Sequence, residues 1–238
     1  MTAATHWGRK AAALYQSAYA RQYRAHDDEL GRGHVYARFC RWLGGICDGF
    51  ERDIDVLELG CGTGRYFRAI RHARTLVGID ASAAMLAEAR APLAADEITT
   101  GSIDLIEADI VTCDLGLSRF DFVYAIGVLA EHTPLDAGIV DKVARCLRTG
   151  GRFAFTTVHP DSASVPRTFR RRAGRLLLPL TWGSVRRILR TRLNAHGLYA
   201  DDTLIRELLR GRFAIESLEH MESEAHLHCL CTARKADG

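Results

Sequence analysis

The segment that most constrains the fold of this chain is a glycine-rich turn at the end of a β-rich run. Residues 54–59 read Ile-Asp-Val-Leu-Glu-Leu, and Gly60, Gly62 and Gly64 follow at alternate positions. Glycine permits a positive φ and lets a ligand approach the main chain closely. A glycine-rich turn alone is a weak signal, so its meaning depends on the segments around it.

Runs rich in β-branched and aromatic residues alternate with helical patterns along most of the chain. Further runs of the first kind cover residues 75–79, 103–110, 120–126, 152–158, 213–218 and 227–233, and helical patterns cover residues 64–71, 82–90, 136–147 and 203–209. Ser82 is placed to cap the second of these helices, and the third is expected to end at Gly150-Gly151. Strands separated by helices of this length pair in parallel through right-handed crossovers. The sequence therefore predicts an α/β fold, a doubly wound seven-stranded mostly parallel sheet with helices on both faces.

Three acidic residues make the glycine turn more informative. Glu58 lies in the strand before the turn, Asp80 ends the next strand, and Asp109 follows the third. The carboxyl ends of parallel strands meet at one edge of an open α/β sheet, and ligands bind at that edge. A carboxylate placed like Asp80 accepts hydrogen bonds from both hydroxyls of a ribose. Three carboxylates around one turn disfavour a pyrophosphate and favour a cationic nucleoside.

The spacing of the glycines separates two families. The dinucleotide fingerprint is G-x-G-x-x-G, whereas here Gly64 comes one place early and Arg65 occupies the expected position. A nicotinamide-dependent dehydrogenase is therefore disfavoured. The segment 58–64 instead resembles the first motif, E-x-G-x-G-x-G, of class I S-adenosylmethionine-dependent methyltransferases. The resemblance runs from about Asp53 to Phe155 and includes residues 77–87, 107–110, 120–123, 128–132 and 147–153.

This resemblance implies a Rossmann-like fold that binds S-adenosyl-L-methionine and releases S-adenosyl-L-homocysteine. The implied cofactor-binding residues are Glu58, Gly60, Cys61, Gly62, Gly64, Asp80, Ala81, Met85, Ala108, Asp109, Ile110, Ile126, Gly127 and Val128. Among them, Asp80 is expected to hold the ribose hydroxyls, while Ala81 and Met85 line the adenine slot. Asp109 is expected to accept from the adenine amino group, and residues 126–128 to pass beside the sulfonium.

The resemblance further implies methyl transfer to an oxygen or nitrogen of a small molecule. For an acceptor that must lose a proton, a general base speeds the transfer. His132 and His159, at the ends of the fourth and fifth strands, are the candidate catalytic residues. Two alternatives stay open: a non-catalytic nucleoside-binding or regulatory protein, and a methyltransferase that acts on a lipid or another anionic amphiphile.

Two segments are candidates for contact with the acceptor. Tyr15, Tyr19 and Tyr23 recur at steps of four, which predicts one helix face that packs on the domain or covers the pocket. Residues 161–196 contain nine arginines and one acid. This segment fits a solvated cap, an interfacial helix on anionic lipid, or a site for an anionic acceptor. The candidate acceptor-binding residues are Tyr15, Tyr19, Tyr23, Arg167, Arg170 and Arg171.

Composition and short motifs limit which partners and which cellular location are expected for this protein. The 238 residues carry a net charge of +3, without a secretory signal or an apolar run long enough to span a bilayer. Seven scattered cysteines are typical of a cytoplasmic protein, which is the expected localisation. Nucleic acid is not expected, because the family's (D/N/S)-P-P-(Y/F/W) motif is absent after the fourth strand. His226, His228, Cys229 and Cys231 lack the spacing of a zinc site, so they are interpreted as strand packing and no metal is expected.

We expect a single methyltransferase domain over residues 1–238. Its expected parts are an N-terminal helical lid (1–50), a cofactor-binding half (51–160), a basic insertion or substrate cap (161–200), and a C-terminal helix with strands (201–238). The identity of the acceptor is not predicted, because acceptors contact loops and lids that vary among proteins of one fold.

Overall fold

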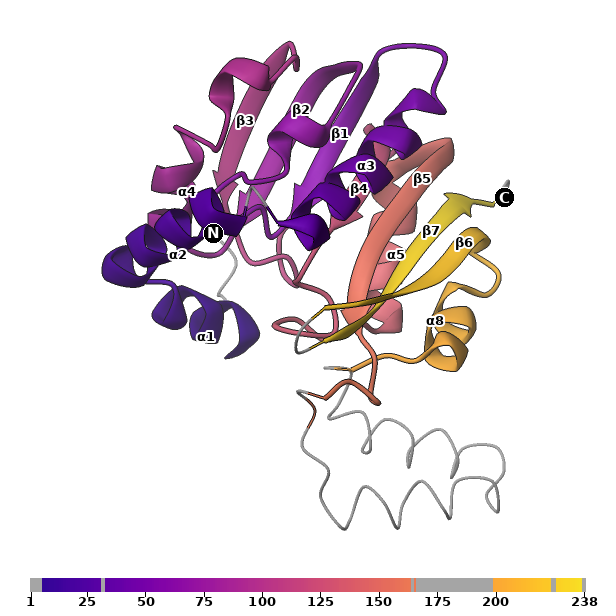
Figure 1. Cartoon of the computed structure of the whole chain (residues 1–238). Helices are drawn as coiled ribbons and strands as arrows, with labels where there is room; N and C mark the ends of the chain where they lie inside the picture. The colour runs from indigo at the N-terminus through magenta and orange to yellow at the C-terminus, as the bar shows by residue number, and fades with distance from the viewer. Residues whose placement is uncertain (1–5, 31–32, 164, 166–198, 224–225, 237–238) are drawn as a thin grey trace.

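Figure 1 shows the computed structural model, which describes residues 6–30, 33–163, 165, 199–223 and 226–236. Seven strands form one sheet in the order β3-β2-β1-β4-β5-β7-β6. Their bounds are Ile54–Leu59 (β1), Ala73–Asp80 (β2), Ser102–Glu107 (β3), Phe120–Ala125 (β4), Leu147–Val158 (β5), Phe213–Glu222 (β6) and Leu227–Lys235 (β7). Strands β1 to β5 pair in parallel, and β7 pairs antiparallel with β5 and β6. The predicted mostly parallel, seven-stranded sheet is confirmed.

Helices cover both faces of this sheet. Their bounds are His6–Leu14 (α1), Ser17–Leu30 (α2), His34–Asp48 (α3), Ala83–Ala89 (α4), Ala137–Cys146 (α5) and Asp202–Leu209 (α8). One apolar core joins the sheet to α5 and α8, and a second joins it to α3 and α4. In Figure 1, α3 crosses the near face and α5 lies behind the sheet. Among the described residues, no helix combines the length and the apolar character needed to cross a bilayer.

Strands β1 and β4 form the centre of the sheet, and every residue in both is buried. Strands covered on both faces need near-continuous apolar runs, which is why the sequence pattern identified them. Glu58 of β1 pairs with Tyr124 of β4, and Leu59 pairs with Ile79 of β2. Because these strands are parallel and in register, the loops that follow them emerge side by side at one edge.

One predicted helix is much shorter than expected, and a second, expected over residues 136–147 and found at Ala137–Cys146, does not end at the predicted glycines. The helix expected over residues 64–71 is reduced to the 3-10 turn Phe67–Ala69. Gly64 has a φ of 74°, a left-handed conformation that cannot start a right-handed helix. The helix expected to end at Gly150-Gly151 ends at Cys146, and β5 begins at Leu147. The glycines lie within β5, next to a register shift in its pairing with β4, rather than at a helix end.

The N-terminal helix is interrupted where the sequence predicted a continuous one. Helices α1 and α2 are separated at Tyr15 and Gln16, and the Ser82 hydroxyl donates to the Tyr15 carbonyl at 2.6 Å. Tyr15 therefore does not share a helix face with Tyr19 and Tyr23. Its ring nevertheless lies 5.4 Å and 6.0 Å from theirs, so the three tyrosines form one cluster. Figure 1 shows α1 and α2 beside the edge where β1 and β2 end.

Candidate functional site

A cavity of about 890 Å³ lies at the edge where β1, β2 and β4 end. Its walls come from the glycine turn, the segments after β2, β3 and β4, and helices α1 to α3. The lining residues that the sequence had singled out are Tyr15, Tyr19, Tyr23, Glu58, Gly60, Cys61, Gly62, Asp80, Ala81, Met85, Asp109, Ile110, Ile126, Gly127, Val128 and His132. Residues as far apart in the chain as Tyr15 and His132 therefore face one space.

The glycine turn presents its main chain to this cavity. Gly60 has a φ of 72° and Gly62 a φ of 53°. The N–H groups of Gly60 and Cys61 donate to the Ile79 carbonyl at 2.7 Å and 3.0 Å, which fixes the turn against β2. A Cβ at Gly60 would lie 2.4 Å from Cγ2 of Val128, which is closer than carbon atoms approach. Position 60 therefore requires glycine for two reasons, its φ and its close contact.

Main-chain hydrogen bonds fix the side chain of Asp80 beside the glycine turn. Its Oδ2 accepts from the Gly62 N–H at 2.9 Å, and its Oδ1 accepts from the Ser82 N–H at 2.8 Å. Burial raises the pKa of Asp80, and these main-chain hydrogen bonds act against that rise. The Ala81 N–H also contributes a hydrogen bond to this carboxyl group, and the two carboxylate oxygens together have about four acceptor sites. A fixed pair of acceptors of this kind suits two neighbouring hydroxyl groups.

Glu58 lies deeper in the cavity wall. The Tyr124 hydroxyl donates to its Oε2 at 2.7 Å, and burial raises the pKa of Glu58 to about 8. The carboxyl group is therefore largely protonated at neutral pH in this structure. An approaching cation favours the charged form of a carboxyl group and lowers its pKa. Glu58 is thus a group whose charge depends on what the cavity holds.

Asp109 lies under the first helix. Its Oδ1 accepts from the Val111 N–H at 2.9 Å, which fixes the carboxylate after β3. A Cβ at Gly8 would lie 2.3 Å from Oδ2 of Asp109, so α1 approaches this carboxylate as closely as a glycine allows. The N-terminal helices therefore close the Asp109 side of the cavity.

His132 and Tyr15 form a polar pair on the same wall. Nε2 of His132 lies 3.1 Å from the Tyr15 hydroxyl oxygen, and the two rings meet edge to face. Burial and the positive charge of Lys10 lower the pKa of His132. Burial, together with the neighbouring phenols, raises the pKa of Tyr15. At neutral pH the imidazole is therefore neutral and the phenol keeps its proton, which leaves His132 able to accept a proton.

Glu131 is a site residue that the sequence analysis did not assign. It lines the cavity, and burial raises its pKa to about 7. Its Oε1 is buried and has no hydrogen-bond partner within the part of the chain that the structure describes. A Cβ at Gly127 would lie 3.8 Å from its Oε2, so the carboxyl group lies beside the end of β4. The residue belongs to the segment 128–132 that carried the resemblance, but neither its burial nor its missing partner is visible in a sequence.

A buried ion pair joins helix α2 to the glycine turn, and no sequence spacing indicated it. Asp27 of α2 accepts from the Thr63 hydroxyl and pairs with the Arg65 guanidinium. That guanidinium also lies over the Tyr23 ring, 4.8 Å from its centroid. The contacts anchor the tyrosine cluster to the turn that lines the cavity.

The remaining predicted site residues lie elsewhere. The Gly64 N–H donates to the Cys61 carbonyl and the Ala108 N–H to the Asp80 carbonyl, each at 2.9 Å, so both shape loops without lining the cavity. His159 follows β5 and also does not line it. Arg167, Arg170 and Arg171 lie outside the described residues.

Comparison with known sequences finds similarity over part of this chain. A family described as a methyltransferase domain matches residues 56–151. Malonyl-[acyl-carrier protein] O-methyltransferase of Enterobacter lignolyticus (strain SCF1) is 39% identical over 111 residues, which cover 45% of this chain and 40% of that relative. The chain spans about two fifths of the length of the curated relatives it matches.

Solved structures that resemble this chain include methyltransferases. An S-adenosylmethionine dependent methyltransferase from Mesorhizobium loti is 25% identical, with a TM-score of 0.54 over 77% of this chain and 92% of that chain. Magnesium protoporphyrin IX methyltransferase from Synechocystis PCC 6803, solved with bound S-adenosylhomocysteine, is 17% identical, with a TM-score of 0.63 over 96% of this chain and 99% of that chain. The second likeness shows the fold, and the sequence match covers the glycine turn and the two acids Asp80 and Asp109.

Proposed function

We propose that the protein transfers a methyl group from S-adenosyl-L-methionine to an oxygen of a small molecule, and that residues 56–151, which match a family described as a methyltransferase domain, carry this activity. One observation carries this proposal: four carboxyl groups line the same cavity as the glycine turn. They belong to Glu58, Asp80, Asp109 and Glu131. A cationic nucleoside favours the charged forms of these carboxyl groups, whereas a pyrophosphate disfavours them.

The residues present fit this cofactor. The guanidinium of Arg65 also lines the cavity, but its ion pair with Asp27 offsets its charge. The buried Oε1 of Glu131, which has no hydrogen-bond partner among the described residues, is an acceptor site that a cationic ligand would stabilise. When bound, S-adenosyl-L-methionine supplies an activated methyl group on a positively charged sulfur.

Three acidic residues of the cavity each have a separate proposed contact with the cofactor. Asp80, fixed by the N–H groups of Gly62 and Ser82, would accept from the ribose hydroxyls. Asp109 accepts from the adenine amino group. Glu131, beside the end of β4, would hold the positive sulfur, whose charge would favour the ionised form of this carboxyl group. Orientation of two reactants in this way supplies up to about 7–11 kcal/mol of the barrier reduction when the geometry is ideal.

The acceptor side of the cavity is lined by the tyrosine cluster and His132. His132, neutral because its pKa is lowered, accepts the proton of an acceptor hydroxyl as the methyl group is transferred. Tyr15 holds the imidazole ring in place through their 3.1 Å contact. Helices α1 and α2 act as a lid that excludes water. Oxygen as the receiving atom is supported by the curated relatives, which are named as O-methyltransferases.

Titration calorimetry with S-adenosylhomocysteine, followed by an assay of its release from S-adenosylmethionine with a panel of small hydroxyl and carboxyl compounds, tests the proposal. Asp80→Ala is expected to lower the affinity about tenfold to hundredfold, because it removes charge-assisted hydrogen bonds. Glu107→Ala is the matched control, since Glu107 pairs with Asp80 in the β2–β3 register but is exposed and outside the cavity lining.

Three results would count against the proposal. Absence of saturable S-adenosylhomocysteine binding rejects the cofactor, and equal affinities of Asp80→Ala and Glu107→Ala reject the assigned site. Tight binding without product from any acceptor rejects the enzyme and favours a nucleoside-binding protein.

A further inference from the structure

A second cluster of chemically reactive side chains lies apart from the cavity. One ligating atom from each of His159, Asp202, His220 and Cys229 lies within 4.8 Å of the other three. These residues come from four places in the fold: the end of β5, the start of α8, β6 and β7. Each of them is absent from the cavity lining drawn from the described residues, so methyl transfer does not account for the cluster.

Sheet register explains why three of the four side chains meet. His220 of β6 is the direct partner of Cys229 of β7, and Cys229 is also the direct partner of Thr157 of β5. His159 is two residues beyond Thr157, and its N–H donates to the Leu227 carbonyl at 2.8 Å, which continues the β5–β7 ladder. Since side chains alternate between faces along a strand, His159, Cys229 and His220 project from the same face.

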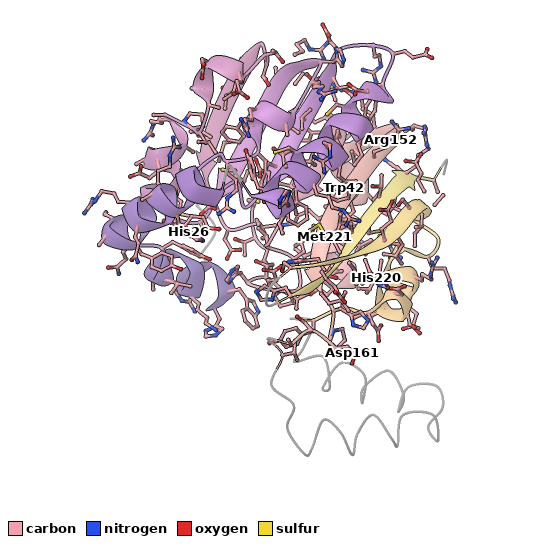
Figure 2. The ribbon with its side chains drawn as sticks, in the orientation of Figure 1. His26, Trp42, Arg152, Asp161, His220 and Met221 are labelled. Atoms are coloured by element: carbon pink, nitrogen blue, oxygen red, sulfur yellow. The ribbon has the colours of Figure 1, made fainter. Side chains whose placement is uncertain are left out.

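Asp202 reaches the cluster because of how α8 begins. The Ala200 N–H donates to the Val158 carbonyl at 3.2 Å, and the Asp201 side chain caps the helix by accepting from Leu204. Asp202 is then the first helical residue. Its Oδ1 lies 2.8 Å from Nε2 of His220 and 3.8 Å from Sγ of Cys229. Figure 2 labels His220 on β6.

The dimensions of the cluster suit a tetrahedral ion. Bonds of about 2.0–2.3 Å to nitrogen, oxygen and sulfur place tetrahedral ligand atoms about 3.3–3.8 Å apart. The separations of 2.8 Å and 3.8 Å bracket this range, and the limit of 4.8 Å leaves a small side-chain adjustment. Asp161, whose Oδ2 lies 3.7 Å from Nδ1 of His159, adds further negative charge beside the cluster.

We propose that His159, Asp202, His220 and Cys229 form a binding site for a divalent transition metal ion of the zinc type. Two imidazole nitrogens, one carboxylate oxygen and one thiolate sulfur are the ligands that such an ion takes. Binding forms the metal–sulfur bond as the Cys229 thiol releases its proton to solvent. With four protein ligands, the coordination is closed and the site is structural.

The position of the site defines its role. His159 and Asp202 flank residues 160–201 in the sequence, so an ion bound to both joins the two ends of that segment. Cross-links that close long segments restrict the unfolded chain most. The ion also joins β5, β6 and β7 at one end of the antiparallel part of the sheet.

The test uses the full chain, stripped with a chelator and then titrated with Zn²⁺ or Co²⁺. We expect one ion per chain, the charge-transfer absorption of a cobalt–thiolate bond, and a thermal midpoint that rises with Zn²⁺ concentration. Changes to outer partners alone weaken metal sites about 10–100-fold, so Cys229→Ser or His220→Ala is expected to weaken binding at least about 100-fold.

Cys231→Ser is the matched control, because Cys231 is buried two residues along the same strand but lies outside the cluster. It is expected to bind as tightly as the unaltered chain. His220 is exposed, so His220→Ala keeps the test valid if Cys229→Ser does not fold. Absence of saturable binding, or equal binding by His220→Ala and the unaltered chain, overturns the proposal.

Discussion

Two groups of carboxyl residues lie at opposite ends of the central strands, and they differ in how their charge is balanced. At the amino ends of β1 and β4, Asp121 accepts from Arg52 and Arg148, each at 2.6 Å, and from the buried Asp55 N–H at 2.8 Å. Burial opposes ionisation of Asp55, but hydrogen bonds from Arg74, Thr75 and Arg148 outweigh it and lower its pKa. At this end of the sheet the protein itself supplies the cations that pair with the carboxylates.

At the carboxyl ends of the same strands the balance is reversed. Burial raises the pKa of Glu58 to about 8 and that of Glu131 to about 7. A carboxyl group that is buried without a matching cation costs stability, and such groups gather at functional sites. One end of the sheet is completed by its own arginines, whereas the other fits the proposed role of completion by a ligand.

Of the substitutions that test this difference between the two ends of the sheet, Glu58→Gln is expected to change the free energy of unfolding most. The carboxyl group ionises near its ordinary value of 4.5 in the unfolded chain and near 8 in the folded protein. Between these values the folded state holds more protons, so raising the pH lowers the free energy of unfolding, by up to about 1.4 kcal/mol per pH unit. Urea unfolding between pH 5 and 8 measures this pH dependence. Glu58→Gln is expected to lose the contribution of Glu58 to the slope of the free energy of unfolding against pH. Parallel slopes in the two proteins contradict the prediction.

Asp121→Ala is expected to lower the free energy of unfolding by about 3 kcal/mol. The change leaves the buried Asp55 N–H without its acceptor and removes two charge-assisted hydrogen bonds, from Arg52 and Arg148. Urea denaturation at neutral pH measures it. S-adenosylhomocysteine affinity of the folded variant should be unchanged, since Asp121 is outside the cavity lining. A loss below about 1 kcal/mol would show that this end of the sheet does not depend on its ion pairs.

Gly60→Ala is expected to weaken S-adenosylhomocysteine binding at least about 100-fold, or about 2.7 kcal/mol. Its new Cβ must displace Val128 or the turn itself. Gly211→Ala is the matched control, because Gly211 has a similar φ of 77° but open space around its Cβ position. Both variants carry comparable backbone strain, and calorimetry should find normal affinity in the control alone. Equal losses would mean that strain, not cavity shape, weakens binding.

Asp48→Ala is expected to have the smallest effect, about 0.5 kcal/mol or less. Asp48 and Arg71 form an ion pair at 2.7 Å, but about half of each side chain is exposed, at 46% and 54%. Water therefore reaches both side chains of this pair, whereas at Asp121 the carboxylate is 1% exposed although its partner Arg52 is 59% exposed. Urea denaturation of both aspartate variants under one set of conditions checks the difference. A loss like that of Asp121→Ala would remove burial as the deciding factor.

The sequence by itself determined the sheet and the most regular parts of the site. Continuous apolar runs identified β1 and β4, and Asp80 was placed at the end of β2 by its spacing from the glycine turn. Such features depend on residues close together in the chain and on strand periodicity, which one sequence displays. The helix expected after Gly64 was wrong because the left-handed φ of that glycine overrides the local helical pattern.

The tertiary structure decided the features that the sequence analysis predicted wrongly or did not assign. It interrupted the first helix at Tyr15, made Glu131 a buried acceptor without a partner among the described residues, and moved His159 from the cavity to a cluster with β6 and β7. These outcomes depend on desolvation and on distances between segments far apart in the chain. Neither quantity exists before the chain folds, so no local pattern encodes either one directly.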